Sequence, residues 1–190
     1  MGRLEERLGV RAVPGGRHPG EGSQNALLAL GPDCYLEILA PDPRQERPDR
    51  PLWLGLEGLA EPRLTAWAVR SSDLQALVRR AETAGVRLGP VREGSRRLAD
   101  GELLSWRLTD PRVREADGLV PFFIDWGSSP HPAASAPAGA SLVALRGEPP
   151  DPGNAATLLG NLELDMPVTK GPRAALVAVL QTRSGLVELR

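Results

Sequence analysis

Two short apolar runs, separated by Gly31-Pro32-Asp33, constrain the fold of this chain more than any other feature. Each run is short enough for a strand, and glycine, proline and aspartate are the residues that form tight turns. The stretch therefore predicts a β-hairpin. The pairing across a three-residue turn gives one uniformly apolar face, which must pack against a core: Leu30 with Cys34, Leu28 with Leu36, and Ala26 with Ile38.

The opposite face of this hairpin has a different chemical character. Side chains alternate along a strand, so the residues between the apolar ones lie together on the second face. They are Asn25, Leu27, Ala29, Tyr35, Glu37 and Leu39. An amide, a phenol and a carboxylate on one surface predict the lining of a polar cavity.

A glycine-rich segment precedes the hairpin. The sequence reads G-G-x-H-P-G-x-G-x-x-N from Gly15 to Asn25, and Y-L-E-I-L-A-P-D-P from Tyr35 to Pro43. This combination resembles the opening of the glyoxalase-like domain, a branch of the vicinal oxygen chelate superfamily that includes glyoxalase, bleomycin-resistance proteins and extradiol dioxygenases. A second match runs through 121–127 and 130–132, so the resemblance extends to about His131. It implies paired βαβββ modules around a concave sheet and does not fix a substrate.

Composition narrows the classes of protein. With 190 residues, 41% of them hydrophobic, the chain can bury a substantial core. The formal net charge is -1, with basic and acidic residues interspersed, so a nucleic acid or an anionic membrane is not an expected partner. The single cysteine, Cys34, cannot form an intramolecular disulfide, and no long apolar run occurs. We expect a cytoplasmic protein with a small-molecule ligand.

The order of predicted elements repeats along the chain. We expect an α+β fold in which repeated βαβββ modules form a curved mixed sheet with helices on its outer face. The first module covers 1–48 and lacks its first strand, and the second covers 49–131. In the second, Ser72-Asp73-Leu74-Gln75 is a capping box that opens a helix ended by Gly85. Strands are predicted at 64–70, 87–92, 103–109 and 119–126, with a polar loop over 93–100.

A third, smaller module is predicted over 140–190. Its strand at 141–146 precedes a helix at 151–159 and three strands at 162–166, 174–181 and 186–189. The last strands of the three modules align as Tyr35-Leu36-Glu37-Ile38, Phe123-Ile124-Asp125-Trp126 and Leu186-Val187-Glu188-Leu189, each with an acidic residue at one matched position. This repetition indicates a modular architecture independently of the family resemblance.

The N-terminal segment is unusual for such a module. Residues 4–8 read as the last turns of a helix stopped by Gly9, followed by a short strand at 10–13, with no strand before the helix. Two explanations stay open: either the true start lies upstream, or another strand fills the slot. The exposed sheet edge beside 10–13 favours association into a homodimer.

Two acidic residues are the candidates for a metal site. In enzymes that the family resemblance implies, a divalent metal is held on the concave face by residues from the first and last strands of two modules. Glu37 and Asp125 occupy the last-strand positions, so we expect them to hold a divalent metal, with Glu37 also catalytic. Carboxylates and water suit Mg²⁺ or Mn²⁺. The alternative is that both line a cavity without metal.

The remaining candidates line the same predicted cavity. His18 lies in the family-like motif and is a candidate general base, or a turn residue that fixes its loop. Arg92, Arg96 and Arg97 are expected at a solvated loop tip, and the alternative is that they bind an anionic substrate. Two functions follow: a metal-dependent lyase, isomerase or dioxygenase acting on vicinal oxygens, or a non-catalytic binder of the resistance type. The candidate ligand-binding residues are Asn25, Tyr35, Trp67, Phe123 and Asp125.

Overall fold

The computed structural model describes residues 2–97 and 103–190. Within these residues the chain is an α+β protein with three α-helices and ten strands in three sheets. The helices are α1 (Gly2–Leu8), α2 (Leu74–Thr83) and α3 (Pro152–Asn161). The sheets have the orders β1-β2-β3, β4-β7-β6-β5 and β10-β9-β8. The α+β class is as predicted, but the strands form separate sheets.

The first sheet contains the predicted hairpin. Its strands are β1 (Val13–His18), β2 (Ser23–Gly31) and β3 (Cys34–Pro41), all antiparallel. The predicted pairs of Leu28 with Leu36 and of Ala26 with Ile38 are confirmed. At the turn the prediction is wrong, because an irregularity after Ala29 makes Cys34 pair with Gly31.

Strand β1 lies further along the chain than predicted. We expected a strand at 10–13 and a bend through the glycines, whereas the backbone from Val13 to His18 pairs with β2 and the turn is confined to 19–22. Gly20 and Gly22 adopt positive φ there, which is the requirement that glycine meets at a turn. Strand β1 ends the first sheet, and β5 lies beside it, so the open edge predicted beside 10–13 and the homodimer stay predictions.

The second sheet is mixed. It contains β4 (Ala68–Arg70), β5 (Arg92–Arg97), β6 (Leu103–Leu108) and β7 (Phe122–Asp125), and β4 runs parallel to β7. Helix α2 begins as predicted, with the Asp73 carboxylate accepting from the Ala76 N–H, and Gly85 follows at positive φ. The strand predicted at 87–92 is instead a connection buried through Val86 and Leu88, and the ladder begins at Arg92. Residues 98–100 of the predicted loop lie outside the described residues.

The third sheet follows a shorter pattern than the predicted module. Strand β8 (Ala140–Gly147) and helix α3 precede two strands, β9 (Leu176–Thr182) and β10 (Gly185–Leu189). The predicted strand at 162–166 is irregular, because Glu163 takes a φ of 58° and the N–H groups of Glu163 and Leu164 bond back to α3. The alternation of Leu162, Leu164 and Met166 reflects packing against neighbouring core residues.

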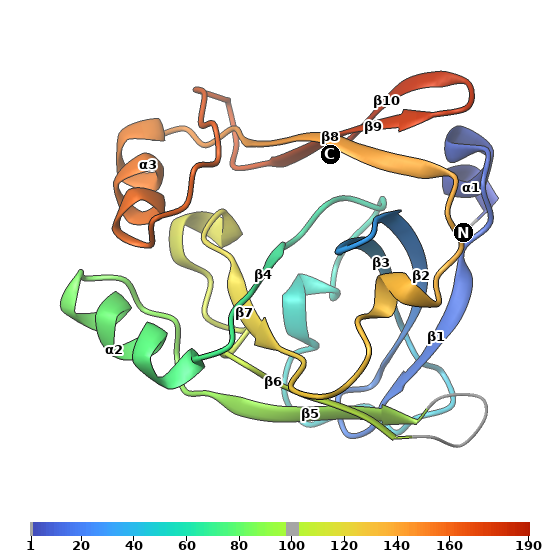
Figure 1. Cartoon of the computed structure of the whole chain (residues 1–190), viewed down its shortest axis with the longest axis horizontal. Helices are drawn as coiled ribbons and strands as arrows, with labels where there is room; N and C mark the ends of the chain where they lie inside the picture. Colours follow the sequence, from blue (N-terminus) through green and yellow to red (C-terminus); the bar gives the residue numbers. More distant parts are fainter. Residues whose placement is uncertain (1, 98–102) are drawn as a thin grey trace.

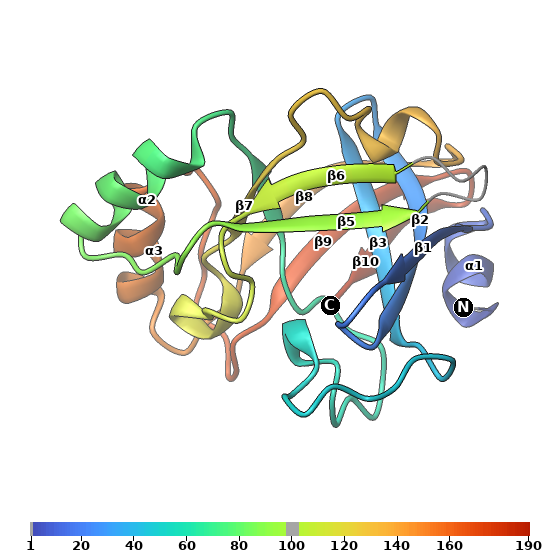
Figure 2. The same cartoon turned by 90° about the horizontal axis from the view of Figure 1, so that it is seen from below.

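The three sheets surround the interior of the molecule. Figure 1 shows β8–β10 along one side, β5 and β6 along the opposite side, and the β2–β3 hairpin between them. The third sheet packs on the apolar face of the hairpin through Ala178, Leu180 and Leu189, and Leu8 of α1 joins that core. The other face of the hairpin is turned toward β5–β7, and Figure 2 shows β5 and β6 crossing the first sheet. The candidate site lies between these two sheets.

No helix in the described part of the chain is both long enough and apolar enough to cross a membrane.

Candidate functional site

A small pocket lies between the first and second sheets. Its volume is about 30 Å³, room for about two water molecules. The first sheet contributes mainly polar side chains and the second sheet mainly apolar ones. The lining residues are His18, Asn25, Leu27, Tyr35, Glu37, Trp53, Leu54, Arg96, Trp106, Leu108, Phe122, Ile124, Trp126 and Pro132.

Asn25 connects the charged groups of the pocket. Its amide Nδ2 donates to Glu37 Oε1 at 2.6 Å, and its Oδ1 accepts from Arg96 Nη1 at 3.3 Å. Nδ2 also lies 3.4 Å from His18 Nε2. A single buried amide therefore separates a carboxylate from a guanidinium and contacts the imidazole.

His18 is buried and held from both sides. Its Nδ1 lies 3.0 Å from Ser23 Oγ, which also accepts from Trp53 Nε1 at 2.9 Å. The neutral tautomer with its proton on Nδ1 satisfies the contacts at both ring nitrogens, because Nε2 then accepts from Asn25. Burial lowers the pKa of His18 below its ordinary value, and the nearby Glu37 carboxylate opposes this shift. At neutral pH the imidazole is uncharged, with the Nε2 lone pair toward the pocket.

Arg96 extends from β5 toward the first sheet. Its residue is only 4% exposed, and burial lowers the pKa of its guanidinium. Its Nε is buried and has no hydrogen-bond partner among the residues that the structure describes. Among the described residues no carboxylate oxygen lies within ion-pair distance of Arg96. Its guanidinium is linked to the Glu37 carboxylate by the two hydrogen bonds of the Asn25 amide.

Two glycines make room for this arrangement. A Cβ at Gly15 would lie 2.3 Å from Asn25 Oδ1 and 2.4 Å from Arg96 Nη1. A Cβ at Gly94 would lie 2.4 Å from Trp106 Nε1, so the indole covers the backbone of the paired strand. Gly15 in β1 therefore leaves room for the hydrogen bond between Asn25 and Arg96, and Gly94 in β5 leaves room for the Trp106 indole.

Aromatic rings enclose the pocket. Trp53 belongs to the short 3-10 helix η1 (Trp53–Gly55) and meets the His18 ring edge-on, with centroids 5.1 Å apart. Trp106 and Trp126 are in tilted contact at 5.4 Å. Tyr35 contacts Trp126 and also His131, which precedes the 3-10 helix η3 (Pro132–Ala134). Burial raises the pKa of Tyr35, so its phenol stays protonated at neutral pH.

The structure brings four of the predicted site residues together. Glu37, His18, Asn25 and Tyr35 all line the pocket. His18 Nε2 lies 3.7 Å from Glu37 Oε1, and the Glu37 side chain is 27% exposed, so the carboxylate reaches solvent. These residues come from all three strands of the first sheet.

Asp125 is not part of this group. In β7 the side chains of Phe122 and Ile124 line the pocket, so Asp125 points to the other face of the sheet. There it accepts from Arg107 Nη2 at 2.5 Å and from the Gly127 N–H at 2.9 Å, and these bonds lower its pKa. The predicted match of Asp125 with Glu37 is offset by one position, which reverses the face.

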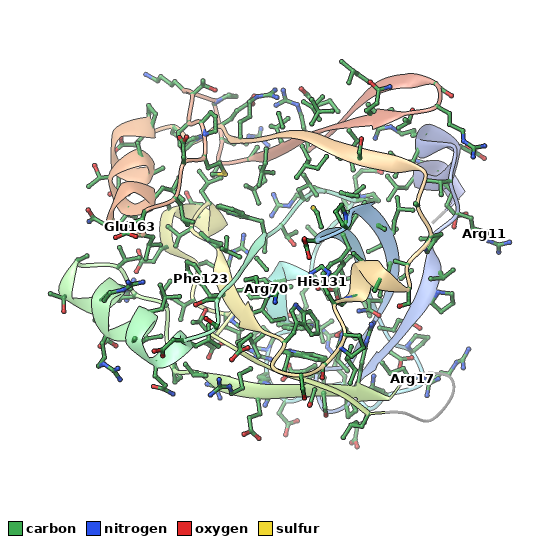
Figure 3. The ribbon with its side chains drawn as sticks, in the orientation of Figure 1. Arg11, Arg17, Arg70, Phe123, His131 and Glu163 are labelled. Carbon is green, nitrogen blue, oxygen red and sulfur yellow. The ribbon has the colours of Figure 1, made fainter. Side chains whose placement is uncertain are left out.

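Trp67 and Phe123 also lie elsewhere. The Trp67 indole packs near Leu119, and its Nε1 donates to the Leu119 carbonyl at 2.7 Å. Phe123 is buried against Leu74 and Leu77 of α2, on the face of β7 opposite to the pocket. The residue is labelled in Figure 3. The aromatic residues that line the pocket instead are Trp53, Trp106, Phe122 and Trp126.

The donor set of the pocket does not fit a resident divalent metal. Glu37 and His18 are its only carboxylate and imidazole, and no group of three His, Cys, Asp or Glu suited to a metal occurs among the described residues. A tight site needs more such ligands, and the Arg96 cation lies in the same pocket. The predicted pair of Glu37 and Asp125 is not assembled into one site.

Sequence reasoning favoured a solvated loop tip for Arg96 over a position at the site, whereas the side chain is buried in the pocket. The alternation of Leu104, Trp106 and Leu108 on β6 was the available signal, because cross-strand partners share a face. In the observed register Arg96 pairs with Leu104 and therefore points to the pocket side with the apolar residues. The register depends on Gly94 opposite Trp106, which no local pattern specified.

Comparisons with known proteins agree with this architecture. The model of the family described as a glyoxalase-like domain matches residues 1–163. A solved structure, described as a hypothetical protein from Staphylococcus aureus, is similar in fold, with a TM-score of 0.55 and 12% sequence identity over 94% of this chain and 76% of that chain. No curated protein matches the sequence. At this identity the structural likeness shows the fold alone.

Proposed function

The chain belongs to the glyoxalase-like domain family, within the vicinal oxygen chelate superfamily, and we propose from this premise that it binds a small molecule directly through the side chains of the pocket between its first two sheets. The observation that carries the proposal is the network of His18, Asn25, Glu37 and Arg96 in an aromatic enclosure. Few, convergent polar groups among apolar walls are typical of small-molecule sites.

The ligand enters by displacing η1. The pocket as it stands has room for about two water molecules, which is less than an organic ligand needs. Leu54 in η1 is buried with a φ of 56°, a strained conformation for a leucine, and Trp53 is tied to the first sheet by its bond to Ser23. Movement of this short segment enlarges the pocket and breaks the hydrogen bond from Trp53 to Ser23.

A second candidate function is catalysis of proton transfer. His18 is neutral at neutral pH, and its Nε2 lone pair, which accepts from Asn25 in the empty pocket, can serve as a general base once a ligand displaces that amide N–H. Glu37 lies 3.7 Å from that nitrogen and stabilises the imidazolium that forms when His18 accepts a proton. Arg96 stabilises negative charge that develops on the ligand. This candidate requires no metal.

A ligand screen tests the binding proposal. Thermal unfolding and saturation-transfer NMR are recorded with a varied set of small molecules, in EDTA. We expect hits for the wild type that are lost in Asn25→Leu, which breaks the network, and kept in Glu82→Gln, which changes an exposed helical carboxylate. Hits that bind Asn25→Leu unchanged, or only after metal is added, would contradict direct binding in this pocket.

The same hits test catalysis. In D₂O the wild type exchanges the acidic C–H of a bound hit for deuterium, and His18→Gln does not, while both bind it. If the wild type exchanges no hit faster than buffer does, the pocket is a binding site without this proton-transfer activity.

A further inference from the structure

The proposed function leaves the chemical class of the ligand open, and Arg96 restricts it. A buried guanidinium is costly unless its N–H groups are hydrogen-bonded. Arg96 is 4% exposed, makes one hydrogen bond to a described side chain, the 3.3 Å contact with Asn25, and has no partner for Nε. Among the described residues, only one of the five N–H groups of its guanidinium has a hydrogen-bond acceptor.

Resting on the proposed function, we propose that the ligand is a monocarboxylate with a small apolar body, and that Arg96 binds its carboxylate. The planar guanidinium can donate two parallel hydrogen bonds to the two oxygens of a carboxylate. Such charge-assisted hydrogen bonds are stronger than hydrogen bonds between neutral groups. The aromatic wall formed by Trp106 and Trp126 then contacts the apolar body.

The charges in the pocket favour one negative charge on the ligand. Glu37 is linked to Arg96 through a single amide, so a second anion in the pocket meets repulsion from this carboxylate. A dianionic phosphate doubles that repulsion and requires more donors than one guanidinium. The volume of about 30 Å³ accommodates a carboxylate-sized head before η1 moves.

The backbone is shaped for this role of Arg96. Gly15 has no side chain where Arg96 Nη1 and Asn25 Oδ1 meet, and any larger residue would overlap both atoms. Arg96 also crosses from the second sheet to the first, so it couples the two walls of the pocket. A purely structural arginine at this depth would complete its hydrogen bonds with protein groups, whereas the described residues offer Arg96 only the Asn25 Oδ1 acceptor.

The test compares acids with their amides. Butyrate, benzoate and phenylacetate are titrated by calorimetry at neutral pH, together with butyramide, benzamide, phenylacetamide and inorganic phosphate. For the wild type we expect at least one acid to bind about tenfold or more tightly than its amide, since a hydrogen bond to a charged group contributes about 1.5–3 kcal/mol. We expect no binding of phosphate.

Substitutions of Arg96 test whether this residue causes the preference for an acid over its amide. Arg96→Met is expected to lose the difference between acid and amide, Arg96→Lys to keep part of it, and Arg80→Met, an exposed control on α2, to keep all of it. Circular dichroism verifies folding, and Arg96→Lys decides the matter if Arg96→Met is unfolded.

Two results would overturn the carboxylate class. If acid and amide bind equally and independently of Arg96, the pocket still binds small molecules and only this inference fails. If none of the acids binds, the inference fails, while the wider ligand screen decides the proposed function separately.

Discussion

The pocket and the surface of the third sheet both combine arginines with carboxylates, in opposite ways. On the third sheet, Arg146 and Arg190 each contact both Glu148 and Glu188, at distances of 2.6–3.0 Å. In the pocket, Arg96 and Glu37 contact each other only through Asn25. The surface cluster is electrostatically complete, whereas the pocket keeps donor capacity for a ligand.

The two regions also differ in what their packing supports. The third sheet buries Leu180 and Val177 completely and covers the apolar face of the β2–β3 hairpin. The opposite face of the same hairpin carries the polar network of the pocket. One pair of strands thus serves stability on one face and recognition on the other, and substitutions on the two faces should separate these properties.

Leu180→Ala should give the largest change in stability. The side chain is fully buried, so its truncation leaves a cavity and should lower the free energy of unfolding by about 2–5 kcal/mol. Ligand affinity of the folded fraction should be unchanged. Urea unfolding and calorimetry measure the two quantities, and a loss of affinity without loss of stability would contradict the division between the faces.

Gly15→Ala should affect the pocket face with a smaller change in stability. The new Cβ would displace Asn25 and Arg96, so ligand binding should be lost while unfolding is destabilised by about 1–3 kcal/mol. Gly160→Ala is the matched control, because its Cβ meets no atom within 4 Å and alanine favours the helix. Unchanged binding by Gly15→Ala would argue against this network.

Acidification should lower stability through His18. Its pKa is lowered in the folded chain, so the unfolded chain binds more protons as the pH falls through the ordinary value of 6.5. The free energy of unfolding should therefore decrease from neutral pH toward about pH 5. Denaturant unfolding of His18→Gln should show a shallower decrease, and the remainder comes from His131 and from carboxylates such as Asp125, whose pKa values are also lowered in the fold. An equally steep decrease in the variant would show that protonation of His18 does not cause the loss of stability.

Glu188→Gln should have the smallest effect. It removes one carboxylate from an exposed cluster in which Arg146 and Arg190 retain Glu148. Ion pairs on a surface contribute little and are screened by salt. We expect a slight decrease in melting temperature that disappears at high salt, with ligand binding unchanged. A large decrease that salt does not reduce would show that the cluster is structurally essential.

Much of the pocket was predictable because it depends on local alternation. The apolar pairs of the hairpin defined one face, and the second face then followed, with Asn25, Tyr35 and Glu37 at the pocket. His18 was predictable only as part of a motif, because the sequence suggested a bend where β1 forms a ladder. Register information within one hairpin was sufficient for these residues.

The remaining features depend on packing between distant segments. Asp125 was assigned to the pocket through an alignment whose one-residue offset reverses the side of the sheet. The strand predicted at 162–166 in the third module does not form, because its apolar residues fill the cores beside α3. The position of Arg96 in the pocket depends on the register of β5 against β6 and on the packing of β5 against the first sheet, which no local sequence pattern specifies.

Glu37→Gln tests most directly whether the side chains of the pocket bind the ligand. Glutamine keeps an oxygen that accepts from Asn25 and removes the negative charge near Arg96. The measurement is a calorimetric titration, in EDTA, of the tightest-binding acid into the wild type, Glu37→Gln and the control Asp125→Asn. We predict binding to all three, tighter for Glu37→Gln and unchanged for Asp125→Asn. Binding that requires an added divalent metal, or that both variants lose, would contradict direct binding by the side chains of the pocket.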